Sequence, residues 1–388
     1  MGMLSEDRIE SLKGIETPFF YYDLDILDRT LDSVNKAIED VPFKVHYAIK
    51  ANTNPRILDR IKQANFGIDC VSGNEVKHAL QNGFKAEHIA FAGVGKTDAE
   101  IKFGLEEGIF TFNVESLPEL EVIDAIAGEM NEIAPVAIRF NPNVNAKTHH
   151  YITTGLEENK FGINYWELDS LFDALERLKN IKLLGLHFHI GSQITDLSVF
   201  QNLCNRVNEL QKLFKEKSIC IEHVNVGGGL GVNYHEPDSE AIPDFESFFQ
   251  IFKQFLELHP GQQLHFELGR SIVAQCSSLI SRVLYIKKGI KTNFAIIDAG
   301  MTELIRPTLY QSYHKIENLT KLNFESNQKY DVVGPICESS DCFGKELQLP
   351  ETERGDLIAI RSAGAYGEVM ASSYNLRDKA KAFYHDEI

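Results

Sequence analysis

The sequence has no long run of apolar residues. In a chain of 388 residues, no stretch approaches the roughly 20 consecutive apolar residues that a membrane-spanning helix needs. Residues 1–14 are polar and do not have the apolar centre of a secretory signal. These absences predict a cytoplasmic protein that does not insert into a membrane.

Basic residues and cysteine are also scarce. The chain has 39 lysines and arginines against 56 aspartates and glutamates, a net charge of -17, which argues against a surface that follows nucleic-acid phosphates. Six cysteines are spread along a chain with no secretory signal, which predicts reduced thiols. The spacing of Cys337 and Cys342 is not a convincing zinc pattern, so no metal is expected.

Short apolar runs alternate with helix-like segments through the first two thirds of the chain. The eight runs are 43–49, 66–71, 88–92, 109–114, 135–140, 182–188, 220–226 and 262–267. The helix-like connectors are 55–64, 73–82, 98–107, 116–127, 165–179, 198–217 and 244–258. This alternation predicts an α/β fold, a (β/α)8 barrel of the TIM type, which usually takes about 250 residues.

The chain changes character after Arg270. Strand-like runs at 279–286, 293–297, 330–333 and 357–361 are separated by glycine, proline and asparagine. A further strand-like run, 17–23, precedes the barrel and is expected to join these strands. The sequence therefore predicts a barrel domain at 24–270 and a second, all-β domain formed by 1–23 together with 271–388.

A lysine stands at the end of the first predicted barrel strand. Lys50 directly follows the apolar run 43–49, and the carboxyl ends of barrel strands carry the chemistry in such folds. An ammonium group at the end of a buried strand needs a reason, because lysine is otherwise a surface residue. We interpret Lys50 as the lysine that forms a Schiff base with pyridoxal phosphate.

The ends of the other predicted strands carry compatible groups. The triple glycine Gly227, Gly228 and Gly229 follows the seventh strand, and Gly269 with Arg270 follows the eighth, the two loops that often hold phosphate in barrels. The alternative interpretation of the three glycines is an ordinary tight turn, and that of Arg270 is a surface salt bridge.

Three further polar residues end predicted strands. Glu267 could face the nitrogen of a pyridine ring or pair with Arg139 or Arg270. His187 and His189 alternate on one face of the sixth strand, where one could stack on the ring; a packed interior histidine is the more ordinary interpretation of His187. These groups suit a cofactor better than a metal.

These residues lie in ordered motifs that resemble the fold-type III pyridoxal-phosphate decarboxylases over nearly the whole chain. The motifs are 47–52, 69–72, Thr154-Gly155 with 160–162, 187–192, 227–231, 267–270, 298–301, 305–307 with Tyr310, 337–339 and 364–367. The resemblance implies an alanine racemase-like architecture and pyridoxal 5'-phosphate as cofactor. It also implies decarboxylation of meso-2,6-diaminopimelate to L-lysine and carbon dioxide, the last step of lysine biosynthesis, by a homodimer with shared active sites.

The resemblance also implies a role for each residue of the site. Lys50 and Cys337 would be catalytic, with Cys337 returning a proton and reaching the site of the partner subunit. The cofactor would be held by Lys50, Asp69, His189, Ser192, Gly227, Gly228, Gly229, Glu267, Gly269, Arg270 and Tyr366. The substrate would be bound by Arg270, Arg306, Tyr310, Glu338 and Tyr366.

Other activities stay open at this point. A related decarboxylase of ornithine, arginine or a D-amino acid is possible, although Arg306 would repel the cationic end of ornithine. A racemase is disfavoured by Glu267, because alanine racemases have an arginine at the ring nitrogen. A silent regulatory homologue would be expected to lose Lys50 or Cys337. Leu268 departs from the family proline, which leaves the loop before Arg270 less rigid.

Overall fold

The computed structural model describes residues 4–143 and 160–388 of the chain, which forms two compact units. The barrel unit consists of Leu31–Gly231 and Asp244–Gly269, and the β unit of Met1–Thr30, Val232–Pro243 and Arg270–Ile388. Residues 24–30 and the segment Val232–Pro243 thus belong to the β unit, whereas the sequence prediction had assigned both to the barrel. The motif Thr154-Gly155 lies outside the described residues.

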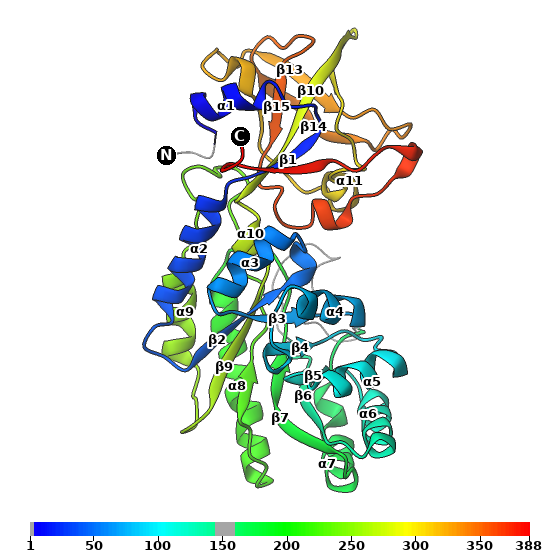
Figure 1. The fold of residues 1–388 in the computed structure, drawn as a ribbon. Helices are drawn as coiled ribbons and strands as arrows, with labels where there is room; N and C mark the ends of the chain where they lie inside the picture. The colour runs from blue at the N-terminus through cyan, green and yellow to red at the C-terminus, as the bar shows by residue number, and fades with distance from the viewer. Residues whose placement is uncertain (1–3, 144–159) are drawn as a thin grey trace. The chain divides into compact units, whose positions relative to one another are not determined.

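The barrel unit is a closed parallel barrel of eight strands within a ring of helices (Figure 1), as the sequence predicted. Its strands pair in chain order, and the last closes the barrel against the first. The strands are β2 (Phe43–Ala48), β3 (Gly67–Cys70), β4 (Ile89–Phe91), β5 (Thr111–Val114), β6 (Ala134–Phe140), β7 (Ile181–Phe188), β8 (His223–Asn225) and β9 (Gln263–Leu268).

Local capping signals set where the barrel helices begin. The side chains of Asn54, Ser72, Thr97 and Ser116 each accept a hydrogen bond from the first turn of the helix that follows. The helices are α2 (Leu24–Ala37), which starts in the β unit, α3 (Pro55–Gln63), α4 (Gly73–Gln81), α5 (Asp98–Glu107), α6 (Leu117–Met130), α7 (Leu168–Arg177), α8 (Ser198–Glu216) and α9 (Phe245–Phe255). Of these, α2 was not predicted.

Strand β9 shows how the sequence directs polar side chains into the barrel. Phe266 faces outward, with its ring centroid 4.8 Å from that of Phe249 and 4.9 Å from that of Phe252 on α9. Its burial stabilises the fold by about 2–3 kcal/mol. Because side chains alternate along a strand, Glu267 points the other way, into the interior, and reaches Asn113 on β5, four strands around the barrel.

The β unit is built on one mixed sheet. Its strand order is β12-β15-β10-β11-β13-β14, and β1 joins it by pairing antiparallel with β10 and parallel with β16. The strands are β1 (Phe19–Tyr22), β10 (Ser277–Lys288), β11 (Asn293–Ile297), β12 (Ile316–Asn318), β13 (Gln328–Val333), β14 (Cys342–Leu349), β15 (Leu357–Ile360) and β16 (Lys381–Tyr384). The N-terminal run therefore joins these strands, as expected.

The sequence did not predict every element of the β unit. Strands β12, β14 and β16 were missed because they are short or carry many charged residues, so their apolar alternation is weak. The unit also contains the short helices α1 (Glu6–Leu12), α10 (Arg270–Val273) and α11 (Arg306–Tyr310). It is thus mostly sheet rather than entirely β.

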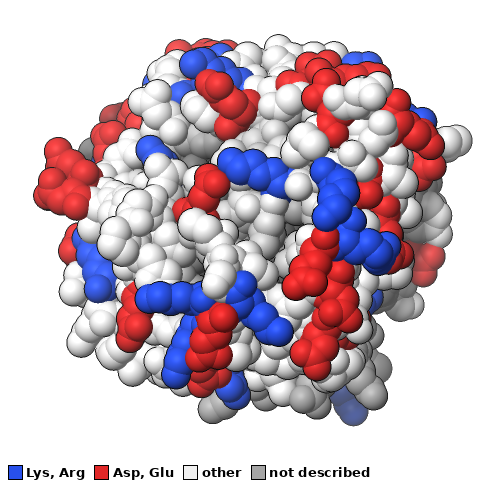
Figure 2. Space-filling model, turned by 90° about the horizontal axis from the view of Figure 1, so that it is seen from below, with Lys and Arg blue, Asp and Glu red and all other residues white. Residues whose placement is uncertain are grey.

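Charges on the surface are mixed in sign. Figure 2 shows lysine and arginine side chains interspersed with aspartate and glutamate over the face drawn there. Within residues 4–143 and 160–388, no helix combines the length and the apolar character needed to cross a bilayer.

A chain of three histidines lies inside the barrel. His46 Nε2 is 2.8 Å from His265 Nδ1, and His265 Nε2 is 2.9 Å from His223 Nδ1, with the ring of Phe110 stacked on His46 and His265. Each of these nitrogen–nitrogen contacts can hold only one proton between its two rings, so the three histidines are best accommodated as neutral rings. Burial lowers the pKa of His46 to about 4 and also lowers the pKa of His265 and His223.

This histidine chain is expected to make the barrel unstable in acid. Because the unfolded chain binds protons on His46 more readily than the folded one, the free energy of unfolding falls as the pH drops from about 6.5 to about 4. The loss from His46 is about 3 kcal/mol when the transition is complete. Urea unfolding at pH 7.5 and pH 5 measures it, and His46→Phe should reduce the pH dependence. An unchanged dependence in that variant would contradict the assignment.

Candidate active site

Lys50 lies in a single turn at the carboxyl end of β2. The strand ends at Ala48 and continues into a 3-10 turn, Ile49–Ala51, which Tyr47 anchors by donating a hydrogen bond from its hydroxyl to the carbonyl of Asn52 at 3.0 Å. The Lys50 side chain is 39% exposed, and its Nζ is 3.6 Å from Oδ2 of the buried Asp69 on β3. The predicted residues Lys50 and Asp69 are therefore brought together by neighbouring strands.

Two carboxyl groups of the barrel interior have opposite pKa shifts. Burial, and the charge of Glu267, raise the pKa of Asp69 well above its ordinary value, although Lys50 opposes this. Burial also acts to raise the pKa of Glu267, but His187 and Lys50 outweigh it and hold that pKa well below its ordinary value. Environments that shift the pKa values of two nearby carboxyl groups in opposite directions are typical of functional sites.

Glu267 is surrounded by hydrogen-bond donors. Its Oε1 accepts from Nδ2 of Asn113 at 3.1 Å and from Nδ2 of Asn225 at 2.8 Å, while its Oε2 lies 3.1 Å from Nε2 of His187. The alternative expectation that Glu267 pairs with Arg139 or Arg270 is therefore wrong. Hydrogen bonds from β5, β7 and β8 to this carboxylate offset part of the cost of burying it.

Arg139 has a different partner on the same barrel. It donates from Nη1 to Oε1 of Glu115 at 2.7 Å, and Glu115 also accepts from the backbone N–H groups of Gly93 and Gly162. This buried ion pair links the carboxyl ends of β4, β5 and β6 to the segment that begins at Lys160. The charge of Arg139 also acts on Asp69 and on His189.

The glycine loop after β8 packs against His189. A Cβ on Gly227 would lie 2.4 Å from the Phe188 carbonyl oxygen and 2.7 Å from Nδ1 of His189, so only glycine fits there. The N–H of Gly228 donates to Nδ1 of His189 at 3.3 Å. Burial, with the charges of Arg139 and Lys50, lowers the pKa of His189 well below its ordinary value. His189 is thus a neutral ring at the carboxyl end of β7.

The backbone amides of this loop are partly occupied. Gly227 N–H donates to Oδ1 of Asn225 at 2.9 Å, and Gly228 N–H donates to His189. The predicted phosphate site must therefore use the rest of the loop, including Gly229, together with Ser192, which is half-buried in the turn after β7. That part of the assignment stays a prediction.

In the β unit, two arginines share one tyrosine. Nη1 of Arg270 and Nη1 of Arg306 each donate to the hydroxyl of Tyr234 at 2.7 Å, and Nη1 of Arg306 is also 3.2 Å from Nε2 of His314. Burial would raise the pKa of Tyr234, but the two guanidinium groups lower it below its ordinary value. The cluster therefore concentrates positive charge around a buried phenol.

Arg306 has no carboxylate partner among the described residues, although only 5% of its surface is exposed. Another buried arginine of the same unit, Arg361, is bound by two carboxylates, Asp238 at 2.7 Å and Glu317 at 2.6 Å. A buried guanidinium without a counterion is costly unless an anion binds to it. Arg306 is therefore a candidate binding site for a carboxylate.

The other predicted residues of the β unit lie in loops and at a helix end. Tyr310 ends α11, four residues after Arg306, and Tyr366 has a φ of 59° with its ring 5.0 Å from the Arg270 guanidinium. Cys337 and Glu338 are exposed, and Glu338 accepts a 2.7 Å hydrogen bond from the hydroxyl of Tyr374.

The sequence prediction missed two residues that organise these clusters. Asn225 alternates with His223 on β8 and so faces the interior, which the strand alternation could have indicated. Tyr234 lies in the segment after the glycine loop, where no periodic pattern marks it. Only the folded chain brings Tyr234 to Arg306, 72 residues later.

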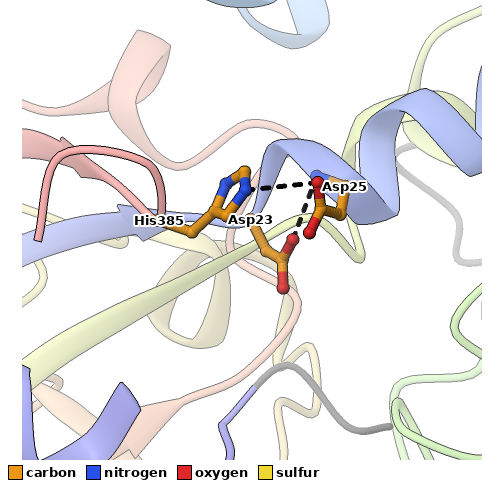
Figure 3. Close-up of side chains that lie close together, drawn as sticks. All are labelled: Asp23, Asp25 and His385. Carbon is orange, nitrogen blue, oxygen red and sulfur yellow. Dashed lines mark hydrogen bonds and ion pairs between the residues drawn. The ribbon is translucent and has the colours of Figure 1, made fainter. Parts of the chain in front are cut away.

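One group of side chains in the described residues has the spacing of a metal site. Asp23, Asp25 and His385 lie close together where β1 meets the C-terminal segment (Figure 3). However, Nδ1 of His385 accepts from the N–H of Leu24 at 3.1 Å, Nε2 is 3.2 Å from Asp25, and Arg8 pairs with both aspartates. The cluster is internally satisfied and fastens β16 beside β1.

The barrel residues fit pyridoxal phosphate. An amine at the end of β2, a neutral imidazole after β7 and an ionised, donor-bound carboxylate on β9 are the groups that this cofactor needs for covalent attachment, ring stacking and pairing with the ring nitrogen. The position of Glu267 is the decisive observation: its buried carboxyl group is lined by Asn113, Asn225 and His187 and is not paired with an arginine among the described residues, which suits pairing with a pyridinium.

Comparison with known proteins identifies the family. Residues 24–274 match the model of the pyridoxal-dependent decarboxylase, pyridoxal binding domain. The chain is 56% identical to a diaminopimelate decarboxylase of Bacteroides thetaiotaomicron over 98% of both chains, and 42% identical to that of Vibrio cholerae over 94% of this chain and 86% of the relative. A crystal structure of diaminopimelate decarboxylase from Helicobacter pylori complexed with L-lysine aligns with a TM-score of 0.91 at 39% identity, over 98% of this chain and 94% of that one. The chain therefore belongs to the pyridoxal-dependent decarboxylases and, within them, to the diaminopimelate decarboxylase family.

Proposed function

We propose that this protein decarboxylates meso-2,6-diaminopimelate to L-lysine and carbon dioxide with pyridoxal phosphate, as a cytoplasmic homodimer in lysine biosynthesis. The observation that carries the choice of substrate is the buried Arg306 without a carboxylate partner among the described residues. A substrate with a second carboxylate would neutralise this guanidinium, whereas the distal ends of ornithine and arginine are cations. The names of the relatives support the same substrate.

Barrel residues, together with Tyr366 of the β unit, hold the cofactor in this proposal. Lys50 would bind it covalently, His189 would stack on its ring, and Ser192, the glycine loop and Tyr366 would bind its phosphate. When bound, pyridoxal phosphate supplies an electron sink for the electron pair left by the departing carbon dioxide. Glu267, whose pKa is held below its ordinary value by His187 and Lys50, would pair with the ring nitrogen and favour a proton there.

The β unit supplies substrate recognition and a proton. Arg306 binds the distal carboxylate, Tyr310 shares this role from the end of the same helix, and Glu338 binds the distal ammonium group. Tyr374 orients Glu338 by donating its hydroxyl hydrogen. After carbon dioxide leaves, the Cys337 thiol gives a proton to the carbon that carried it, which completes L-lysine.

The surroundings of Cys337 support a shared site between two subunits. Cys337 is exposed, and its N–H donates to Oδ1 of Asn375 at 3.2 Å in a loop where Tyr374 is 47% exposed and Leu376 is 96% exposed. Exposed aromatic and aliphatic side chains beside a catalytic thiol are typical of an interface rather than of a solvated loop. A second copy of the chain is therefore the partner that would place Cys337 in a site.

Mixing two inactive variants tests this arrangement. Cys337→Ala and Lys50→Ala proteins are each expected to be inactive, while their co-refolded mixture regains up to about a quarter of the activity, because random pairing gives heterodimers with one intact site. The measurement is L-lysine formation, with heterodimers quantified by differently tagged chains. Abundant heterodimers without activity would show that each site is built from one chain.

Turnover of the substrate tests the proposed function directly. Purified protein with pyridoxal phosphate should release carbon dioxide and L-lysine from meso-2,6-diaminopimelate, and not turn over ornithine, arginine or D-lysine at comparable rates. If the protein binds the cofactor but does not react with diaminopimelate, the family assignment stands and the substrate assignment is refuted. Preferential release of carbon dioxide from ornithine would instead remove Arg306 from its proposed role.

A further inference from the structure

Three uncharged or weakly basic side chains converge on the Glu267 carboxylate. Asn113 and Asn225 donate their amide hydrogens to Oε1, and His187 occupies Oε2 through Nε2. They come from β5, β8 and β7, and all three are at most 6% exposed. The barrel thus surrounds one carboxylate from several directions, with no arginine paired to it among the described residues.

We infer that Asn113, Asn225 and His187 are positioning residues for the reaction: they keep Glu267 ionised and oriented, so that the ring nitrogen of the cofactor retains its proton. This inference rests on the proposed role of Glu267 and deepens it. Each hydrogen bond stabilises the carboxylate more than the carboxylic acid, so together the three bonds favour the ionised state. Burial acts in the opposite direction and would raise the pKa of Glu267.

The unused atoms of the same side chains favour a functional role. Oδ1 of Asn113 and Nδ1 of His187 are buried and have no hydrogen-bond partner in the described part of the chain. Buried polar atoms are nearly always paired, because an unpaired one costs about 1–3 kcal/mol. Apolar residues would fill these positions at less cost, so the polar side chains are explained by what they do to Glu267.

Other charges also act on Glu267, and a test must leave them in place. Among the described residues, the titratable groups that interact with it lie on β2, β3, β7 and β9 and just after β2 and β7: His46, Lys50, Asp69, His187, His189 and His265. Asn113 is uncharged, and in the described part of the chain its side chain donates to Glu267 alone, so its replacement changes no charge. Asn225 also accepts from Gly227, so its loss would disturb the glycine loop.

The variants that test the inference most directly are Asn113→Ala, His187→Leu and the double variant. The double variant removes one hydrogen-bond partner from each oxygen of Glu267. Each lost bond should favour the protonated carboxyl about 10- to 100-fold, because hydrogen bonds to charged groups contribute about 1.5–3 kcal/mol. We expect kcat to fall about 10-fold in each single variant and further in the double variant. KM should change little, because Asn113 and His187 contact Glu267 and are not among the residues proposed to bind the substrate.

The direct readout is the ring nitrogen itself. With pyridoxal phosphate labelled with 15N in the ring, the wild-type protein should give the resonance of a protonated nitrogen at every pH at which it is folded. In the double variant, the resonance should move toward that of the unprotonated ring as the proton shifts to Glu267. The dissociation constant of the cofactor should rise by about 10-fold.

The matched control is Asn318→Ala in the β unit. Asn318 is likewise buried and donates from Nδ2 to a carboxylate, Asp356, at 2.9 Å. This variant should lose thermal stability but keep the wild-type kcat and 15N resonance. Wild-type kcat and a fully protonated ring in the double variant would overturn the inference.

This experiment separates the inference from the proposed function. If the wild-type protein binds the labelled cofactor but does not decarboxylate diaminopimelate, the substrate assignment fails. The 15N comparison of wild type and double variant would still test what holds Glu267 ionised. If turnover is normal but the ring nitrogen of the wild-type protein is unprotonated, the role of Glu267 fails and the inference fails with it.

Discussion

Replacement of Lys50 by alanine is expected to abolish decarboxylation while leaving the barrel folded. Without the amine the cofactor cannot be held covalently, so turnover should fall by at least about 10^3-fold. The fold should tolerate the change, because the Lys50 side chain is 39% exposed and lies in a turn after the strand. Activity and thermal unfolding measure the two effects.

A covalent label makes the Lys50 result specific. Borohydride reduction followed by peptide mass spectrometry should find the cofactor on the peptide that contains Lys50 in wild-type protein and no covalent cofactor in the variant. Lys182→Ala is the control, because Lys182 forms an ion pair with Glu222 at 3.2 Å on the surface of the same unit and should be dispensable. Turnover by Lys50→Ala near the wild-type rate would refute the assignment.

The second large effect is expected at Arg306. Arg306→Met should reduce kcat/KM for diaminopimelate by about 100-fold or more, because a buried carboxylate that loses its cationic partner costs about 2–5 kcal/mol. Without ligand, the free energy of unfolding of the variant should be at most about 1 kcal/mol below that of wild type. The reason is that the variant loses a buried charge that has no carboxylate partner among the described residues. Steady-state kinetics and urea unfolding measure both quantities.

Arg361→Met is the matched comparison for Arg306. Arg361 is equally buried but is neutralised by Asp238 and Glu317 within the chain. Its loss should reduce the free energy of unfolding by about 2–3 kcal/mol, less than for a fully buried pair because Asp238 is partly exposed, and should leave KM near the wild-type value. Equal effects of the two substitutions on stability and on KM would mean that Arg306 is a structural arginine.

The sequence marked Lys50 by its place at the end of a predicted strand. Lys50 ends an apolar strand, and the alternation of strands and helices placed that strand end on the working face of a barrel. The eight barrel strands were predicted within a few residues, because strands buried between helices give short continuous apolar runs. Strands such as β14, in which charged residues face solvent, gave no such signal.

The sequence by itself determined the barrel, the added β sheet with its N-terminal strand, and the candidate residues at the strand ends. These properties follow from local patterns: the period of apolar residues, capping residues, and glycine where a side chain would collide with the backbone. Only the tertiary structure decided which polar groups pair. Among the described residues, Glu267 contacts Asn113 and His187 rather than an arginine, and Arg306 donates a hydrogen bond to Tyr234 rather than to a carboxylate. Pairing depends on distances between strands and loops far apart in the chain, and no local pattern encodes those distances.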